Sequence, residues 1–464
     1  MADPIEIEKL AAEVGDSNFS DGRLNNRLQS LVATLAKDPS LSLPKALNSG
    51  ELEAAYRFFS NQRVTPPEIL SSHFEATRKR CEAEGDFLVV HDSTSFSYRY
   101  DGDREGLART SRSKKRSSQT FFAHVSLAIA ANGTRRPLGV AAFKTWVRAA
   151  EADGTERKRW GEQIRAASAQ LDASERAIHL ADREADDYEM FSELKQDSLR
   201  FVVRCQHNRR IVDAEDGLRL RESFAQVTAT IDREVLLSRR TERPTDILRK
   251  IHPKRDKRVA KLSVAATTVE LIKPSSRVGT KSGATLSINV VRVWEPEPPN
   301  GAAPIEWYLY TSEPIETAEQ QLKVIDYYRA RWVIEEYFKA IKTGCDFERR
   351  QLQDYEALIN LLAIFAPIAY HLLLIRSEAA RQPDQPALAV VSQDQLDVLR
   401  ACGRRTLPTT PTARDVYLAI AALGGHIKYA PDPGWLTLAR GYEELETLTH
   451  GWRAAKLQLA SDQR

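Results

Sequence analysis

Cysteine is scarce in this chain, and its few cysteines form no regular pattern. Only four occur among 464 residues, at Cys81, Cys205, Cys345 and Cys402, with no C-x-x-C pair. A structural zinc site or a disulfide framework needs several cysteines at close and defined spacings. Neither kind of stabilisation is therefore expected here.

Long uninterrupted apolar runs are also lacking. The one long apolar stretch, Ala357–Ile375, is broken by Asn360, Pro367 and His371. A membrane-spanning helix needs about 20 predominantly apolar residues, so this stretch predicts a pair of buried helices instead. The amino-terminal residues Met1–Pro4 do not begin a signal peptide. We expect a soluble, cytoplasmic protein without a membrane partner.

The chain has no strong excess of charge of either sign. It contains 67 Lys and Arg against 64 Asp and Glu, which gives a formal net charge of +3. A nucleic-acid-binding surface would therefore have to come from local clusters of basic residues. The densest basic segments lie at 239–243 and 250–258, where a flexible phosphate-holding loop is expected. A second basic loop, at 104–116, is either a solvated loop or a phosphate contact.

The most informative stretch is Tyr328–Lys342, which has helical apolar spacing and no Gly or Pro. Tyr328, Arg331, Glu335 and Lys342 follow the pattern Y-x2-R-x3-E-x6-K. On one continuous helix these four side chains share a face, whereas Glu336 points about 100° away. The phenol of Tyr328 and the cations of Arg331 and Lys342 could bind a phosphate backbone. The carboxylate of Glu335 could bind a metal ion beside it. The plainer interpretation is a solvated helix face held by ion pairs.

Two further acids follow short apolar runs. The run 86–91 leads into Asp92, and the run 177–181 leads into Asp182. Each pattern predicts a buried strand with an acid at its exit. Asn132-Gly133 lies between apolar runs and predicts a hairpin. By itself, the DREAD sequence at 182–186 is also a plausible helix start, because acids favour the amino-terminal end of a helix.

These motifs resemble those of a known family. The Tyr328–Lys342 stretch is similar to the YREK signature, and DREAD to the second acid motif, of bacterial DDE transposases of the insertion-sequence-four (IS-four) family, above all its Tn-five type. The resemblance implies Asp92, Asp182 and Glu335 as catalytic residues and metal ligands. Mg2+ prefers carboxylate oxygens, and two such ions, with Mn2+ expected to substitute, promote in-line attack at phosphorus.

The same resemblance implies a set of DNA contacts. The sequence around Arg27 and Arg57 is similar to the family's domain that binds the transposon end, although scattered arginines on a helical bundle are usually only surface. Trp307 and Trp332 fall where the family stacks on a flipped base, although a packing role is the commoner one for tryptophan. The implied DNA-binding residues are Arg27, Arg57, Arg204, His207, Trp307, Tyr328, Arg331, Trp332 and Lys342. Gln206 departs from the family, which has lysine there.

The expected fold is α/β, with a ribonuclease-H-like mixed sheet flanked by helices. We predict a helical DNA-binding domain at 1–70, a catalytic domain at 71–380 with a β-rich insertion at about 210–305, and a helical carboxy-terminal dimerisation domain at 381–464. Strands are expected at 259–271 and 284–294 because these segments are rich in alternating Val, Thr and Ile.

The implied function is cut-and-paste transposition in a bacterial, nucleoid-associated setting. The expected steps are nicking at the 3′ end, hairpin formation and resolution, and strand transfer. The expected partners are double-stranded DNA, both transposon ends and target, and a second copy of the chain in a synaptic complex. Two alternatives remain: a catalytically silent DNA-binding regulator derived from a transposase, and a ribonuclease-H-like nuclease without strand transfer.

Overall fold

The computed structural model describes most of the chain, and its contacts divide the chain into two units. The described residues are 7–15, 17, 19–37, 39–99, 102–109, 118–147, 155–173, 175–212, 217–224, 227–229, 231–237, 254–275, 282–300, 302, 304–427 and 432–462. The first unit comprises Met1–Asp153, Arg165–Ala173 and Trp332–Arg464, and the second comprises Gly154–Ile164 and Ser174–Arg331.

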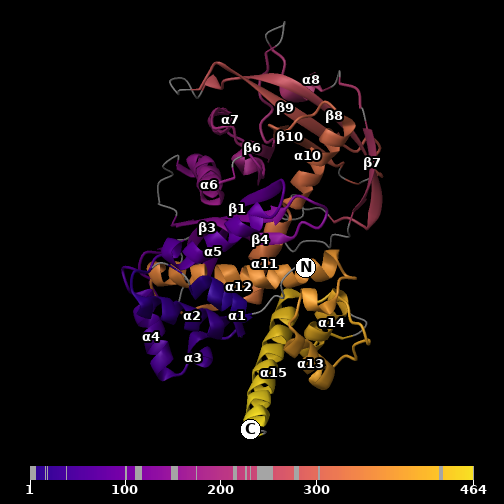
Figure 1. Ribbon diagram of the computed structural model, residues 1–464. Helices are drawn as coiled ribbons and strands as arrows, with labels where there is room; N and C mark the ends of the chain where they lie inside the picture. The colour runs from indigo at the N-terminus through magenta and orange to yellow at the C-terminus, as the bar shows by residue number, and fades with distance from the viewer. Residues whose placement is uncertain are drawn as a thin grey trace. The chain divides into compact units, whose positions relative to one another are not determined.

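The first unit begins with helices, as the sequence predicts. They are α1 (Ile7–Gly15), α2 (Gly22–Lys37), α3 (Leu43–Ala46), α4 (Ser49–Phe59) and α5 (Pro66–Glu82) (Figure 1). Leu28, Leu31 and Leu35 are buried at helical spacing along α2, which makes one face of that helix apolar. Helix α4 starts at a capping box, in which Asn48 and Glu51 each accept a hydrogen bond from the other's backbone N–H.

The strands of the first unit form an antiparallel sheet. They are β1 (Phe87–Arg99), β2 (Ala108–Arg109), β3 (Ser118–Ala130) and β4 (Pro137–Trp146). Strand β3 pairs with β1, β2 and β4, and the predicted hairpin at Asn132-Gly133 joins β3 to β4. The prediction that β1 ends at Asp92 is wrong, because pairing with β3 continues to Arg99. What ends at Asp92 is the fully buried part of the strand: Phe87–His91 are buried and Asp92–Ser95 are half-buried.

The second unit contains a mixed sheet with strand order β5-β6-β10-β9-β8-β7. The strands are β5 (Ala177–Ala181), β6 (Arg200–Arg204), β7 (Ile231–Leu237), β8 (Arg258–Ile272), β9 (Thr285–Trp294) and β10 (Glu306–Thr311). Strands β5 and β6 are parallel, whereas the pairs β6–β10, β10–β9, β9–β8 and β8–β7 are antiparallel. The predicted strands at 259–271 and 284–294 are thus confirmed as β8 and β9. The predicted α/β class with a mixed sheet and flanking helices is confirmed.

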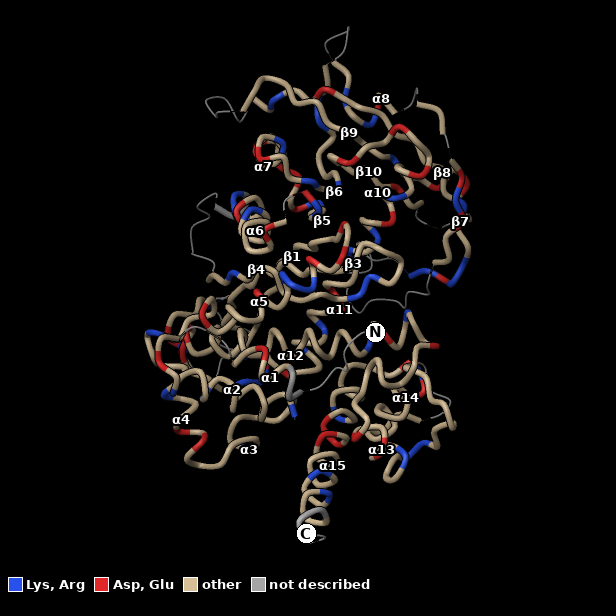
Figure 2. The backbone as a smooth tube through the Cα atoms, in the orientation of Figure 1, with Lys and Arg blue, Asp and Glu red and all other residues tan. Residues whose placement is uncertain are grey.

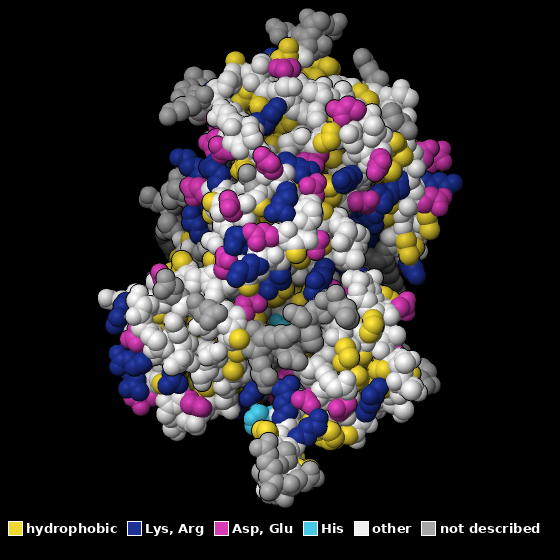
Figure 3. All heavy atoms as spheres, in the orientation of Figure 1, with side chains coloured by type: hydrophobic (Ala, Val, Ile, Leu, Met, Phe, Trp, Pro, Cys, Tyr) yellow, Lys and Arg dark blue, Asp and Glu magenta, His cyan; other side chains and the backbone are white. Residues whose placement is uncertain are grey.

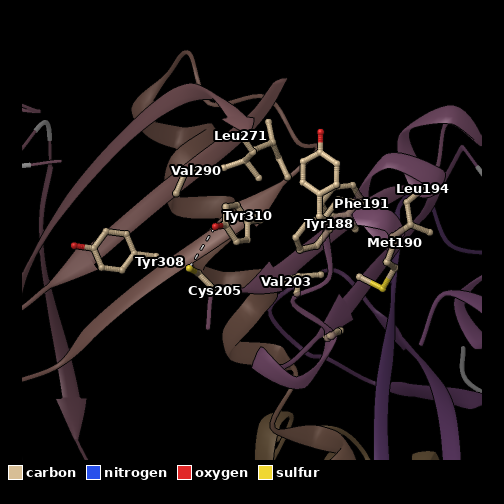
Figure 4. Packing of buried hydrophobic residues seen from close by; sticks show 14 of the residues in the cluster. Tyr188, Met190, Phe191, Leu194, Val203, Cys205, Leu271, Val290, Tyr308 and Tyr310 are labelled. Atoms are coloured by element: carbon tan, nitrogen blue, oxygen red, sulfur yellow. Dashed lines mark hydrogen bonds between the residues drawn. The ribbon is translucent and has the colours of Figure 1, made fainter. Parts of the chain in front are cut away.

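Helices pack on both faces of the second unit's sheet. Helices α7 (Tyr188–Gln196), α8 (Leu220–Ser223) and α10 (Ala318–Ala330) belong to this unit, and α6 (Thr155–Leu171) belongs to it up to Ile164. On one face, Phe191 of α7 stacks on Phe201 with ring centroids 5.6 Å apart. Tyr310 lies beside Phe191, with ring centroids 5.2 Å apart (Figure 4). The opposite face, which carries Trp307, is covered by α10. Successive side chains of a strand point to opposite faces of the sheet. One face therefore packs in the core, and the other face carries the candidate site residue Trp307.

The apolar stretch near the carboxy terminus is a single helix of the first unit, α12 (Tyr355–Arg381). The prediction of a helix pair is wrong, because Pro367 lies inside the helix without ending it. Proline removes one backbone hydrogen bond, but almost every residue around it is buried against neighbouring elements, and this packing maintains the helix. By length and composition α12 could cross a membrane, yet its apolar window is completely buried, as in the core helix of a soluble protein.

The carboxy-terminal part is helical. It consists of α13 (Gln393–Cys402), α14 (Ala413–Leu423) and α15 (Trp435–Asp462). A β-carbon added to Gly441 would lie 1.8 Å from the carbonyl oxygen of Ile420, so α14 and α15 approach backbone to backbone. The last turns of α15 extend past α13 and α14 (Figure 1), where Leu457 and Leu459 are 74% and 62% exposed.

Candidate active site and DNA-binding residues

The Tyr328–Lys342 stretch is not one continuous helix. Helix α10 ends at Ala330, helix α11 spans Val333–Lys339, and a π-helical turn covers Ala340–Gly344. At the first break the Arg331 N–H donates to the Tyr328 carbonyl at 3.1 Å, three residues back rather than four. The prediction of one continuous helix over Tyr328–Lys342 is therefore wrong. Tyr328 and Arg331 belong to the second unit, and Glu335 and Lys342 to the first.

The two candidate aspartates are held in a similar way. Asp182 directly follows β5, as predicted, and its Oδ1 accepts a hydrogen bond from the Glu184 N–H at 2.8 Å. Asp92 lies in β1, and its Oδ1 accepts from the Ser93 N–H, also at 2.8 Å. Both carboxylates are half-buried. A backbone donor on one oxygen restricts the rotation of each carboxylate.

The third candidate acid, Glu335, is half-buried on α11, which packs against β1. Asp92 and Glu335 belong to the first unit and Asp182 to the second. Within the described ranges, no group of three or more His, Cys, Asp and Glu side chains is gathered to hold a metal ion. The carboxylate donors themselves fit Mg2+, which prefers hard oxygen ligands. The three-acid site remains a prediction.

Glu336, the residue after Glu335, has structural partners within the first unit. Its Oε1 accepts from Lys339 Nζ at 2.6 Å, and its Oε2 accepts from Trp435 Nε1 at 3.1 Å. Arg376 Nε lies 3.6 Å from the same Oε2. Burial raises the pKa of Glu336, but Lys339, Arg376 and Trp435 outweigh this effect and hold the pKa below its usual value. Glu336 thus joins α11 to α12 and α15.

Lys342 lies against β1 within the first unit. Its Nζ donates to the Ser95 carbonyl at 2.6 Å and lies 5.3 Å from the centre of the Phe96 ring. Glu348 is 3.9 Å away, and burial lowers the pKa of Lys342 despite this carboxylate. The Lys342 ammonium group therefore lies against β1, the strand that carries Asp92. This position would allow it to bind a phosphate near that acid.

Four predicted DNA-binding residues come together in the second unit. The rings of Trp307 and Tyr328 meet edge to face, with centroids 5.5 Å apart. Arg204 lies 5.9 Å from the Trp307 ring, and Arg331 lies 6.0 Å from the Tyr328 ring. We call Arg204, Trp307, Tyr328 and Arg331 the aromatic–arginine cluster. Its members lie on β6, on β10, and at the end of α10.

Asp182 is close enough to this cluster to act on it electrostatically. Burial raises the pKa of the Tyr328 hydroxyl, Arg331 and Arg204 oppose this rise, and the charge of Asp182 adds to it. Tyr328 also shares a hydrogen bond with Arg204. In the second unit, one candidate metal ligand therefore neighbours a group of two rings and two guanidinium groups.

Sequence reasoning missed Arg209, which organises the segment after β6. Asp186 is completely buried and forms an ion pair with Arg209, the closest N–O distance being 2.5 Å. The Asp186 carboxylate also accepts from the N–H groups of Gln206 and His207, at 2.7 and 2.8 Å. Asp186 therefore holds the backbone that presents the exposed side chain of His207. No local spacing in the sequence indicates this pair.

Three further predicted DNA-binding residues, Arg27, Arg57 and Trp332, belong to the first unit. Trp332 is 56% exposed, unlike a core tryptophan, at the turn between α10 and α11. Arg27 is half-buried on α2. Arg57 is exposed on α4 and lies 3.5 Å from Glu53, one helical turn away. Such an exposed pair contributes little stability. Arg57 can therefore leave Glu53 and bind another anion with little loss of stability.

The basic segments predicted from composition are only partly described. Residues 110–117 and 238–253 lie outside the described ranges. Arg104 is not solvated: it is buried and donates to the carbonyl oxygens of Leu352 and Arg99 at 3.1 and 3.2 Å. Basic and acidic positions alternate along both units (Figure 2), and both signs lie side by side on the face seen in Figure 3. This mixture matches the small net charge.

Comparison with known families identifies the class of protein. The family described as Transposase DDE domain matches residues 85–368, more than half of the chain. The chain belongs to this family of DDE transposases. A second family, described as Transposase DNA-binding, matches residues 8–64, which contain α1 to α4. The amino-terminal helices are therefore a transposase DNA-binding domain.

The chain is also similar to a solved cryo-EM structure of a piggyBac transposase synaptic complex with hairpin DNA. The match covers 98% of this chain and 82% of that chain, with 10% sequence identity and a TM-score of 0.39. A similarity at this level supports no conclusion about residues or reaction steps.

Proposed function

We propose that this protein is a cut-and-paste DNA transposase of the IS-four family, of the Tn-five type. The observation that carries the proposal is the position of Asp182 directly after β5, whose Ala181 pairs with Val203, the residue before Arg204 of the aromatic–arginine cluster. A carboxylate beside two rings and two guanidinium groups suits a metal-dependent reaction on DNA that has been opened at its end.

In this proposal Asp92, Asp182 and Glu335 hold the metal ions. Divalent Mg2+, with Mn2+ as a substitute, supplies activation of the attacking oxygen and stabilisation of the leaving oxygen. The hydrogen bonds from the Ser93 and Glu184 N–H groups keep the two aspartates in fixed rotamers for this task. In this proposal Glu336 is not a metal ligand, and its carboxylate instead accepts from Lys339 and Trp435.

The aromatic–arginine cluster holds the DNA end. A base removed from the duplex stacks on the ring of Trp307. This stacking contributes about 1–3 kcal/mol and so offsets the base stacking that is lost in the duplex. Trp332, with its large exposed surface, provides a second ring. Arg204, Arg331 and Lys342 bind backbone phosphates through charge-assisted hydrogen bonds. Tyr328 and His207 donate further hydrogen bonds to phosphate oxygens.

The amino-terminal helices recognise the transposon end, with Arg27 and Arg57 as phosphate or base contacts. The catalytic domain extends over 71–380, between a DNA-binding domain at 1–70 and a dimerisation domain at 381–464. The exposed apolar end of α15, with Leu457 and Leu459, is suited to pair two copies of the chain. The protein acts in the bacterial cytoplasm, associated with the nucleoid.

The reaction begins with a nick at the 3′ end of the element. The new 3′ hydroxyl attacks the opposite strand to form a hairpin, which is then reopened, and the freed end joins target DNA. The test uses purified full-length protein, Mg2+ and linear DNA that carries the terminal repeats of its element. Products are separated on a denaturing gel, with Asp182→Ala and Glu335→Ala in parallel.

Hairpin-ended fragments and joined products that disappear in both variants are the expected result. Tight end binding without cleavage in Mg2+ or Mn2+ would contradict an enzyme and leave a DNA-binding regulator. Cleavage without hairpins or joined DNA would leave a nuclease. Glu336→Gln tests whether Glu335, and not Glu336, is the metal ligand. This variant removes the charge next to Glu335 and is expected to retain cleavage at high Mg2+.

A further inference from the structure

Glu336, the residue next to the candidate metal ligand Glu335, is held by side chains from two other helices of the first unit. Trp435 is the first residue of α15, and its indole Nε1 donates to Glu336 Oε2 at 3.1 Å. Arg376 of α12 lies 3.6 Å from the same oxygen. Glu336 is three-quarters buried, so both contacts are shielded from water.

Arg376 also fixes the first turn of α15. Its guanidinium lies 4.9 Å from the centre of the Trp435 ring, in a cation–π arrangement. One of its Nη atoms donates to the Pro433 carbonyl at 2.8 Å, immediately before α15. Trp435 is only 6% exposed. Arg376, Trp435 and Glu336 therefore form one connected group, which we call the α15 brace.

The α15 brace also contacts the turn that carries Lys342. A β-carbon added to Gly344 would lie 3.9 Å from the Trp435 ring, so this ring packs on the end of the π-helical turn Ala340–Gly344. Tyr337 of α11 donates from its hydroxyl to the Ala366 carbonyl of α12 at 3.1 Å. The side of α11 opposite to Glu335 is thus fixed at several points, while α11 packs against β1, the strand of Asp92.

We propose that Trp435 and Arg376, acting through Glu336, are positioning residues that fix α11 and thereby the carboxylate of Glu335. Consecutive helix residues point about 100° apart, so the contact that immobilises Glu336 also sets the direction of Glu335. The carboxy-terminal helix is in this way part of the support of the metal-binding acid. The inference rests on the proposed function, because it takes Glu335 as a metal ligand.

The test compares three variants of the full-length protein. Trp435→Phe keeps an aromatic ring but removes the indole N–H, and Glu336→Gln keeps an acceptor for that N–H but removes the ion pairs. Asp394→Asn is the matched control, because Asp394 ties the same helix α15 to α13 through Arg453 and Lys456 at 2.9 and 2.8 Å, away from α11.

The first measurement is hydrogen–deuterium exchange of residues 333–344 in metal-free protein. The second is the Mg2+ concentration that gives half-maximal nicking, alongside the Kd for end DNA in EDTA. Trp435→Phe and Glu336→Gln are expected to speed exchange in 333–344 and to raise the Mg2+ requirement roughly fivefold to tenfold. The Kd for DNA is expected to stay within about twofold, since neither residue is a DNA contact. The control should behave like wild type.

Unchanged exchange in 333–344 for both brace variants would overturn the inference. Equal effects in Asp394→Asn would also overturn it, because they would indicate a general loosening of α15. A double variant whose effect equals the larger single effect would support action through one contact. If wild-type protein does not cleave DNA, the proposed function fails, whereas the exchange comparison still decides whether the brace holds α11.

Discussion

Asp186 and Arg209 form a buried ion pair that connects the DREAD motif to the segment after β6. Their side chains are 0% and 8% exposed, and the Asp186 carboxylate accepts two further backbone N–H bonds. The pair therefore links the loop of the candidate metal ligand Asp182 to the segment of His207. Its loss should affect both stability and DNA handling.

Asp186→Asn is expected to lower the free energy of unfolding by roughly 3–5 kcal/mol, because it leaves the Arg209 charge buried without its partner. Urea unfolding at pH 7 measures this loss. Glu297→Gln, at an exposed position of the same unit, is the matched control and should change little. A loss under about 1 kcal/mol for Asp186→Asn would mean that water or another group compensates Arg209.

Trp307→Ala is expected to slow hairpin formation roughly 10- to 100-fold while the first nick changes little, because in the proposed reaction a base stacks on this ring for the hairpin step. Time courses on denaturing gels separate the two products. Trp307→Phe should recover part of the rate. Tyr328→Phe retains the ring that meets Trp307 and removes only the hydroxyl bonded to Arg204. Equal slowing of nicking and hairpin formation would contradict a role in base flipping.

Glu13 stabilises the first unit in a pH-dependent manner. Its carboxylate accepts from His73 Nδ1 at 2.6 Å and from Arg80 at 2.9 Å. His73 Nε2 accepts from the Val140 N–H at 3.1 Å, so the neutral ring with its proton on Nδ1 satisfies both contacts. Burial raises the pKa of Glu13, but His73 and Arg80 outweigh burial and hold the pKa below its usual value.

A carboxyl whose folded pKa is depressed contributes stability above its unfolded pKa and loses it as the pH falls through the folded pKa. Glu13→Gln should therefore cost about 2 kcal/mol at pH 7, and its difference from wild type should shrink below about pH 4.5. Urea unfolding across this range tests the sign. Glu53→Gln, in an exposed pair with Arg57, is the control. A difference that grows on acidification would contradict the assignment.

Gly441→Ala is expected to separate α15 from α14, because the new methyl group would overlap the Ile420 carbonyl. Overpacking of this kind costs roughly 1–3 kcal/mol or more. Gly451→Ala is the control on the same helix, since nothing lies within 4 Å of its added carbon. That change should stabilise the helix by about 0.5–1 kcal/mol. Thermal unfolding of both variants distinguishes packing from helix propensity, and destabilisation by both would exclude the steric explanation.

Local pattern predicted most elements correctly. Helical apolar spacing indicated the amino-terminal helices, alternation indicated β8 and β9, and an apolar run followed by an acid indicated β5 and Asp182. These features depend on which side chains alternate or recur within a few residues, and the sequence contains that information directly. The motif residues around Asp182 and Glu335 likewise indicated a DDE transposase, and the family match confirms that class.

Tertiary structure decided the rest, because the deciding contacts join distant residues. The Trp435–Glu336 bond spans 99 positions, and no local spacing specifies it. Burial keeps α12 intact across Pro367 where the isolated pattern favours a break. Helical period predicted one face for Tyr328, Arg331, Glu335 and Lys342, yet the chain divides between α10 and α11. The sequence by itself determined the class of protein and most local elements, and packing between distant segments determined which side chains hold one another.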